Sequence, residues 1–433
     1  MLTRIEIDGF KTFKDFALDV PEFLVVLGQN ASGKSNLFDA IAFLSRLARG
    51  AAVKGAVRDT RGGLPEFVHR DDAGRRADRV RFAVELSVDD ARPAVGTLRY
   101  ELELVLVSED PLDPEGTESL TIAAERWMHP EPGSDGARRV WRPVPAPRTE
   151  DLVEGATGEY PYPARFAFRP EVGHTPDGLI VLVWDDGSIS ETRQQLASWQ
   201  VLALEPSALR RPDSYEDDDR LSASGEHLPN ALSRMVRRTR REDRPLGVLN
   251  DLATDMASIV PEVIGLRLDD DRVRKLRSVL VRTRGQAEYS ARAISDGTLR
   301  ALAMVTALRD PDESGLLCIE EPENGIYPRL LTRFVRRVAR WTSPSAARRK
   351  PRQVMMTSHS PAVLAALADP PAAEPFRKDA VYFDLVARVG EDSVSRVTRA
   401  RRVRTGAPLP RPLDAPVLSL AELDEFLGRG EQL

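Results

Sequence analysis

The 433-residue sequence contains a single cysteine, Cys318, and no continuous apolar stretch of the length that crosses a membrane. One cysteine excludes an internal disulfide and is typical of proteins of the reducing cytosol. A membrane-spanning helix needs about 20 apolar residues, and the N-terminal segment also lacks the pattern of a secretory signal. We therefore expect a cytoplasmic protein with no membrane partner.

An excess of positive charge is also missing. The chain has 62 Lys and Arg against 67 Asp and Glu, a formal net charge of −5 at pH 7, which argues against a molecule that is a basic nucleic-acid binder as a whole. Basic residues, mostly arginine, are nevertheless clustered at positions 237–241, 272–277, 348–350 and 399–404. Each cluster could follow a phosphate backbone, which makes DNA a possible partner, or could be a solvated surface.

The clearest motif that is present is a phosphate-binding loop. Residues 28–35 read Gly-Gln-Asn-Ala-Ser-Gly-Lys-Ser and fit the pattern G-x-x-x-x-G-K-[ST]. The apolar run at 24–27 predicts a buried strand before it, and the spacing of apolar residues at 36–44 predicts a helix after it. Strand, loop and helix in this order are the context that a P-loop requires.

The residue types of this loop suit the phosphates of ATP. Gly28 and Gly33 let the backbone curl so that successive N–H groups face the phosphates, and the helix N-terminus adds partial positive charge. We expect Lys34 to reach the β- and γ-phosphates and Ser35 to place its hydroxyl on Mg²⁺.

Two carboxylates follow a second apolar run. Residues 316–319 are apolar and precede Glu320 and Glu321, and carboxylates at the end of a buried strand are costly unless they have a task. We assign Glu320 to the metal and Glu321 to the attacking water. The alternative is that both are simply solvated at the strand end.

Two further motifs complete the set. His359 follows a strand predicted at 354–357, where it could donate a hydrogen bond to the γ-phosphate, although a lone histidine is often structural. Residues 295–298, Ser-Asp-Gly-Thr, open a helix predicted at 299–308. Ser295 and Gly297 could hold a phosphate there, or Ser295 could be a simple helix cap.

Together these motifs resemble the ABC-type ATPases of the RecF, SMC and OLD group, often described as AAA-like ATP-binding proteins. Members begin with a strand pair like residues 5–13 and have a P-loop of the type Gly-x-Asn-x-Ser-Gly-Lys-Ser-Asn. The matching positions are Gly28, Asn30, Ser32, Gly33, Lys34, Ser35 and Asn36.

The resemblance implies that ATP lies between two protomers, with Lys34 of one facing Ser295 and Gly297 of the other. It also implies a homodimer or higher homo-oligomer. Two positions depart from the family pattern, because Glu320 stands where Asp is commoner and Tyr327 stands where many relatives carry His.

The predicted fold class is α/β: a P-loop NTPase of the ABC-ATPase-head type with an antiparallel β edge and an inserted helical lobe. The expected division has an N-terminal half of the ATPase lobe with a β subdomain (1–189, with an insertion near 130–147), a helical lobe with strands leading to residue 295 (190–290), a C-terminal half of the ATPase lobe (291–405) and a tail (406–433). Strands are predicted at 80–86, 98–107, 179–184, 266–283, 288–291 and, as a pair, 378–399; helices at 230–238, 246–256 and 418–427; and a loop at 213–220.

Comparison with the SMC, OLD and RecF relatives narrows the expected function. The middle of the chain lacks the long heptad arms of SMC proteins, and only about 70 residues follow His359, which is too few for the nuclease domain of OLD proteins. By resemblance we expect an ATPase that dimerises on ATP and controls a separately encoded effector, commonly a nuclease, in bacterial anti-phage defence. The alternative is a RecF-like DNA-repair clamp. A transporter motor is disfavoured, because residues 294–298 lack the Leu-Ser-Gly-Gly-Gln form.

Overall fold

A computed structural model describes residues 1–87, 96–108, 118–131, 140–143, 166–168, 180–182, 188–285, 287–342, 352–367, 378–389, 393–403 and 417–418. The chain forms two compact units, one of residues 1–20, 31–199 and 384–400 and the other of residues 21–30, 200–383 and 401–433. Each unit therefore combines segments that are far apart in the sequence. The expected insertion near 130–147, the basic cluster at 348–350 and the helix at 418–427 lie wholly or largely outside the described residues.

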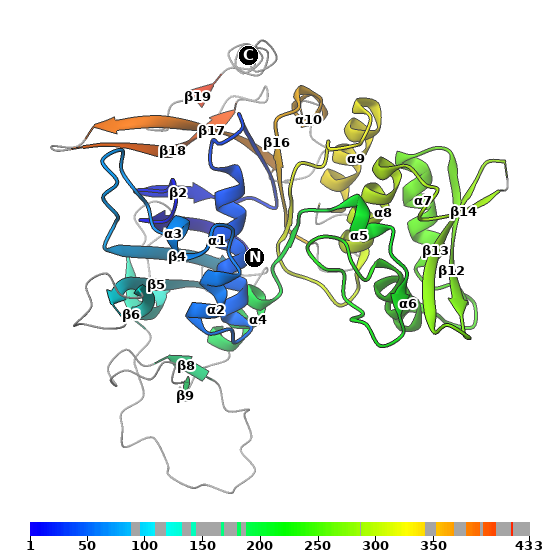
Figure 1. Ribbon diagram of the computed structural model, residues 1–433, viewed down its shortest axis with the longest axis horizontal. Helices are drawn as coiled ribbons and strands as arrows, with labels where there is room; N and C mark the ends of the chain where they lie inside the picture. Colours follow the sequence, from blue (N-terminus) through cyan, green and yellow to red (C-terminus); the bar gives the residue numbers. More distant parts are fainter. Residues whose placement is uncertain are drawn as a thin grey trace, which may run out of the picture. The chain divides into compact units, whose positions relative to one another are not determined.

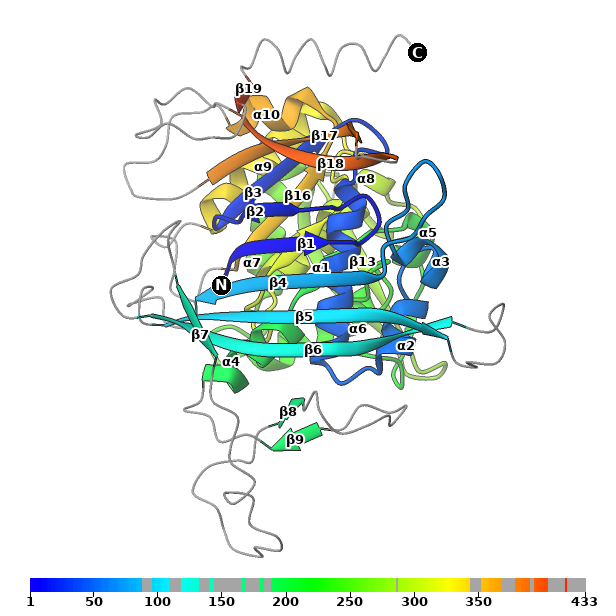
Figure 2. The same ribbon diagram turned by 90° about the vertical axis from the view of Figure 1, so that its left-hand side faces the viewer.

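The first unit is built on a six-stranded antiparallel sheet in the order β2-β1-β4-β5-β6-β7 (Figure 2). This sheet confirms the predicted antiparallel edge, and the strands expected at 80–86 and 98–107 are β4 and β5. The bounds are β1 (Leu2–Asp8), β2 (Phe16–Asp19), β4 (Arg79–Ser87), β5 (Thr97–Ser108), β6 (Glu118–Pro130) and β7 (Trp141–Pro143), with a separate pair β8 (Phe166–Phe168) and β9 (Ile180–Leu182).

One face of this sheet is covered by the helix that follows the P-loop. Alternate residues of β4 point inward, and Phe82 meets Phe43 of α1 with ring centroids 5.4 Å apart. Phe10 and Phe67 complete a fully buried aromatic cluster. The helices of this unit are α1 (Lys34–Ala48), α2 (Val53–Arg58), α3 (Gly63–Phe67) and α4 (Ser188–Ala197).

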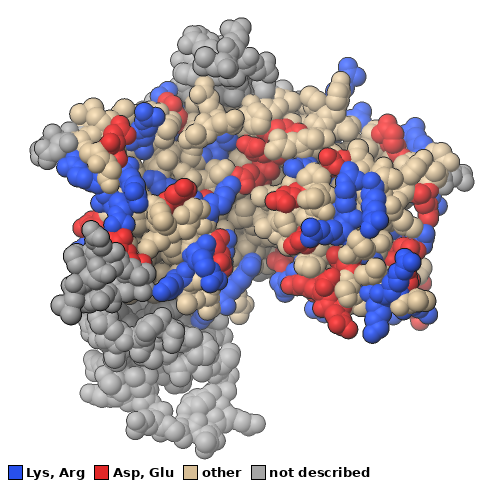
Figure 3. All heavy atoms as spheres, viewed as in Figure 1, with Lys and Arg blue, Asp and Glu red and all other residues tan. Residues whose placement is uncertain are grey.

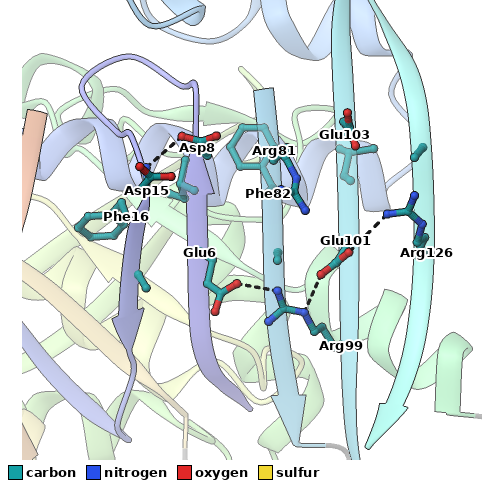
Figure 4. A pocket seen from close by; sticks show the side chains of 15 residues that line it. Glu6, Asp8, Asp15, Phe16, Arg81, Phe82, Arg99, Glu101, Glu103 and Arg126 are labelled. Carbon is teal, nitrogen blue, oxygen red and sulfur yellow. Dashed lines mark hydrogen bonds and ion pairs between the residues drawn. The ribbon is translucent and has the colours of Figure 1, made fainter. Parts of the chain in front are cut away.

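The other face of the sheet carries a ladder of charged side chains (Figure 4). Arg99 lies at its centre and donates to Glu6, Glu85 and Glu101 at 2.6, 3.1 and 2.9 Å. Burial by itself would lower the pKa of Arg99, but the bonds to the carboxylates raise it. A cavity of about 270 Å³ lies over this ladder. It contains none of the predicted site residues, so we interpret the ladder as cross-strand stabilisation.

The second unit holds most of a seven-stranded sheet in the order β10-β15-β16-β3-β17-β18-β19, and β10, β15, β16, β3 and β17 run parallel. Of the parallel strands, β16 and β17 are labelled in Figure 1. The core strands of the sheet, β3, β15 and β16, are buried along their whole length, as strands covered on both faces are. The bounds are β3 (Phe23–Gly28), β10 (Gln200–Leu202), β15 (Leu317–Ile319), β16 (Val354–Ser358), β17 (Lys378–Val389), β18 (Val394–Val403) and β19 (Val417–Leu418).

Helices and a smaller antiparallel sheet complete this unit. The helices are α5 (Pro206–Leu209), α6 (Leu228–Thr239), α7 (Leu249–Ile259), α8 (Asp296–Arg309), α9 (Pro328–Trp341) and α10 (Pro361–Leu367). The strands are β11 (Asp213–Ser214), β12 (Val263–Asp271), β13 (Leu276–Thr283) and β14 (Glu288–Ser290). The loop expected at 213–220 was partly wrong, because its first two residues pair with β13. Within the described part of the chain, no helix is long and apolar enough to cross a membrane.

Candidate functional site

Three of the predicted motifs start at the carboxyl ends of adjacent parallel strands in the second unit. β3 ends at Gly28, the first residue of the P-loop, and β15 ends directly before Glu320. Between them, β16 ends directly before His359. The registers pair Ile319 with Met356 on one side of β16 and Leu27 with Ser358 on the other. The three motifs therefore share one edge of the sheet, the edge at which parallel α/β sheets bind ligands.

The P-loop turn depends on a glycine that no other residue can replace without a clash. Gly33 caps α1 in the left-handed region, with φ 97°. A Cβ atom at this position would lie 2.2 Å from Oγ1 of Thr398 and 2.8 Å from Oγ1 of Thr12. The backbone and these two side chains thus fix the turn that leads into Lys34, which is 5% exposed.

A chain of hydrogen bonds holds the loop from the side. Asn36 donates to Oγ1 of Thr12 at 2.9 Å, the hydroxyls of Thr12 and Thr398 are 2.7 Å apart, and Thr398 donates to the carbonyl of Ser32 at 2.9 Å. Because each hydroxyl has one proton, Thr12 must be the donor to Thr398. Asn36 was predicted to bind the nucleotide, whereas neither threonine was predicted as a site residue.

An ion triad fixes the start of the P-loop helix. Asp39 of α1 accepts from Lys11 at 2.7 Å and from Arg61 at 2.8 Å, and the Asp39 and Lys11 side chains are only 11% and 8% exposed. Arg61 also donates to the carbonyl of Ser35 at 3.0 Å. None of the three was predicted as a site residue, because their contacts join separate segments of the chain.

The two carboxylates after β15 differ in their surroundings. The backbone N–H of Glu320 donates to the carbonyl of Leu202 at 2.8 Å, which continues the pairing with β10. Glu321 has a positive φ of 43°, which is uncommon for a residue with a side chain. Its N–H donates to Oγ1 of Thr357 at 3.2 Å, and its Oε2 accepts from Asn324 at 2.9 Å. Strain of this kind clusters at functional sites.

His359 lies between two carboxylates from the loop after β15. Its Nδ1 is 3.8 Å from Oε1 of Glu321 and 3.2 Å from Oε1 of Glu323. The structure thus brings together the predicted residues Glu321 and His359. Glu323 was not predicted, although its place two residues after Glu321 in the Glu-Glu-Pro-Glu-Asn string was a signal that could have been used.

Ser295 and Gly297 have well-defined places within their own chain. Ser295 caps α8, and its Oγ accepts from the N–H of Thr298 at 3.3 Å. A Cβ atom at Gly297 would lie 2.1 Å from the carbonyl of Gly325. The start of α8 therefore packs against the loop that carries Glu321 and Glu323. Ser295 is exposed, so its hydroxyl is also accessible from outside the chain.

Arg300 links the same helix to this loop electrostatically. Burial lowers the pKa of the Arg300 guanidinium, while the nearby carboxylates of Asp296, Glu205 and Glu321 act in the opposite direction. Together with the packing at Gly297, this places the motif at 295–298 beside the carboxylate loop within one unit.

The residues present fit a nucleotide with a magnesium ion. In the P-loop, Oγ of the buried Ser32 has no hydrogen-bond partner among the described residues, and a buried hydroxyl without a partner is costly unless a ligand supplies one. The hydroxyl of Ser35 and the carboxylate of Glu320 are oxygen ligands, the type that Mg²⁺ prefers.

Known proteins resemble the chain in sequence over a short stretch and in fold over nearly its whole length. A chromosome partition protein Smc from Methanocaldococcus jannaschii is 50% identical over 44 residues, which are 10% of this chain and only 4% of that protein. An SMC head bound to the C-winged helix domain of ScpA matches with a TM-score of 0.50 and 11% identity, covering 92% of this chain and 98% of that one. An SMC head with an extended coiled coil from Pyrococcus furiosus, bound to the C-terminal domain of ScpA, matches with a TM-score of 0.50 and 11% identity. This match covers 92% of this chain and 96% of that one.

A family model described as "AAA domain, putative AbiEii toxin, Type IV TA system" matches residues 23–128 and 185–365, more than half of the chain. The match includes the P-loop, the motif at 295–298, both carboxylates and His359. The SMC-head likeness confirms the predicted P-loop NTPase fold of the ABC-ATPase-head type. The chain therefore has this P-loop NTPase fold and belongs to the AAA family of that description.

Proposed function

We propose that this chain binds and hydrolyses ATP with Mg²⁺, dimerises on ATP and uses that cycle to control a separate effector. The observation that carries the proposal is the position of the P-loop start, Glu321 and His359 at the carboxyl ends of three adjacent parallel strands. A site at such an edge combines backbone N–H groups, carboxylates and a histidine, which are the parts that phosphoryl transfer needs.

Each residue has a separate task in this proposal. Lys34 and the N–H groups of the P-loop bind the phosphates. Ser35 and Glu320 hold Mg²⁺, which would offset the phosphate charge when bound. Glu321 orients the attacking water and accepts its proton, and His359 donates a hydrogen bond to the γ-phosphate. Asn30, Ser32 and Asn36 shape the loop around the nucleotide.

The biological role is inferred from the family. Its description names a putative toxin of a type IV toxin–antitoxin system, which supports a role in bacterial defence, including defence against phage. We propose a separately encoded effector, a nuclease being the first candidate, as the partner. Copurification of the chain with the products of neighbouring genes, with and without ATP, tests this part.

A substitution at Ser295 tests whether two chains share the ATP site. Aspartate caps a helix as well as serine does, so Ser295→Asp should keep α8 but place a negative charge where a partner's γ-phosphate would lie. We expect it to bind ATP normally and to lose hydrolysis by at least about 30-fold. Ser295→Asn, which keeps the cap without the charge, is the matched control and should retain most activity.

Mixing two variants then distinguishes a catalytic site shared between two chains from a site within one chain. Lys34→Ala protein contributes an intact Ser295, and Ser295→Asp protein contributes an intact Lys34, so a mixed dimer has one complete site. If the site is shared, some hydrolysis returns on mixing. Full turnover by Ser295→Asp alone, at dilutions where only monomers exist, would contradict the two-protomer mechanism.

A second candidate function, binding of a DNA backbone, is favoured by helix α9. This helix contains five arginines and no acidic residue. Four of them are exposed, at positions 329, 333, 336 and 340, and recur along one side of the helix. Arg329, Arg333 and Arg340 form no ion pair with a carboxylate among the described residues.

The predicted basic cluster at 237–241 is partly neutralised by carboxylates. Basic and acidic side chains are interspersed over the face drawn in Figure 3. In the predicted cluster at 237–241, Arg237 pairs with Asp219 at 3.5 Å and Arg238 with Asp312 at 3.4 Å. Two of the four arginines in this cluster are therefore paired with a carboxylate, whereas three of the four exposed arginines of α9 have no such pair among the described residues.

Charge reversal on α9 tests this candidate. The triple variant Arg329→Glu, Arg333→Glu, Arg340→Glu should weaken binding to duplex DNA and should reduce the slope of log K against log salt by about 3, since each lost phosphate contact accounts for about 0.9. Basal ATP hydrolysis should not change. Arg237→Glu with Arg238→Glu is the control with paired arginines. If wild-type protein does not bind DNA in low salt, the effector role stands and the DNA role is wrong.

A further inference from the structure

Glu323 makes a set of contacts that joins two loops of the candidate site. Its Oε1 accepts from Oγ of Ser358 at 2.8 Å and from the backbone N–H of His359 at 2.8 Å. The same oxygen is 3.2 Å from Nδ1 of the His359 ring. One carboxylate oxygen on the loop after β15 therefore meets both the main chain and the side chain at the end of β16.

The burial of Glu323 indicates that its carboxylate is not an ordinary solvated surface group. Its side chain is only 8% exposed, whereas the His359 side chain is 47% exposed. The second oxygen, Oε2, is buried and has no hydrogen-bond partner among the described residues. A carboxylate in such a place lowers stability, and function is a common reason for keeping a costly group.

We propose that Glu323 is a positioning residue that holds the His359 ring in the orientation needed for ATP hydrolysis. This inference rests on the proposed function, in which His359 meets the γ-phosphate. A half-exposed side chain samples several rotamers, and fixing one of them costs entropy. A charged acceptor at Nδ1 selects one ring orientation and leaves Nε2 directed away from Glu323, available to the nucleotide.

A purely structural role is the competing explanation, because Glu323 also binds Ser358 and the His359 main chain. A double-mutant cycle separates the two. If Glu323 acts through the His359 ring, its removal matters little once that ring is gone, and the two effects are not additive. If Glu323 only holds the loop, its removal lowers activity to a similar extent in both backgrounds.

The experiment measures steady-state ATP hydrolysis with saturating Mg²⁺ for wild type, Glu323→Ala, His359→Ala and the double variant. We expect Glu323→Ala to lower kcat about 10- to 100-fold, the range for losing a hydrogen bond to a charged group, with little change in the affinity for an ATP analogue. In the His359→Ala background, the same change should lower kcat less than about 3-fold.

Two further variants keep the test sound if Glu323→Ala fails to fold. Glu323→Gln retains an oxygen that can accept from Ser358 and the His359 N–H but loses the charge facing Nδ1, so an intermediate kcat and a wild-type melting temperature support the inference. The cycle is then repeated with this variant. Glu313→Gln is the matched control, since Glu313 is 12% exposed, forms an ion pair with Arg220 in the same unit and lies outside the site.

The outcomes distinguish this inference from the proposed function. Equal losses from the Glu323 change in both backgrounds overturn the positioning role and leave the ATPase proposal intact. Normal turnover by His359→Ala overturns the assigned role of His359 and, with it, this inference. A loss of about 10- to 100-fold from the Glu323 change that is confined to the wild-type background supports both.

Discussion

Lys34→Ala should reduce ATP affinity by at least about 30-fold, because removing one partner of a buried charged contact costs about 2–5 kcal/mol and each 1.4 kcal/mol is a factor of ten. Lys34 is 5% exposed and follows the Gly33 turn directly. Alanine at this position leaves the phosphate charge without its main side-chain partner. Titration with a fluorescent ATP analogue measures the effect.

Lys14→Ala is the matched control, since Lys14 is an exposed lysine of the same unit. It should bind the analogue like wild type. A melting curve for each variant separates lost binding from lost folding, because removing a buried lysine could itself change stability. Unchanged affinity in a folded Lys34→Ala protein would contradict the P-loop assignment.

The sequence was sufficient where chemistry and local pattern coincide. An apolar strand, a glycine turn and an amphipathic helix are consecutive in the chain, so the element around Gly33 and Lys34 was predictable from neighbours alone. The same holds for Glu320 and His359, each of which follows a short buried strand. Whether these residues perform the assigned tasks stays a prediction.

The sequence could not show what supports the site. Thr12, in the turn before β2, and Thr398, in β18, are 386 residues apart, and no local sequence pattern at either position predicts a hydroxyl partner. The order of the parallel strands, with β16 between β15 and β3, likewise arises from crossovers that local periodicity does not record. Gly297 was interpreted as a phosphate contact, and the structure adds a second reason for glycine there, the close carbonyl of Gly325.

Glu321→Gln should bind ATP normally and hydrolyse it about 10²- to 10⁴-fold more slowly, the usual contribution of a positioned general base. The amide keeps an oxygen that can accept from Asn324, as Glu321 does at 2.9 Å, so the loop with its positive φ should survive. The variant loses only the negative charge that accepts a proton from water. ATP-dependent dimers should therefore accumulate, which size-exclusion chromatography with ATP measures.

Glu320→Gln distinguishes the two adjacent carboxylates. If Glu320 supports Mg²⁺, its variant should need more Mg²⁺ for half-maximal hydrolysis, and excess metal should restore much of the rate. No amount of Mg²⁺ should restore Glu321→Gln, because a missing proton acceptor is not replaced by metal. The reverse pattern, with Mg²⁺ rescuing Glu321→Gln alone, would exchange the roles of the two residues. Glu320 is hydrogen-bonded through its N–H to β10, whereas Glu321 is turned out of the strand at φ 43°. This difference favours Glu320 as the residue that supports Mg²⁺ and Glu321 as the proton acceptor.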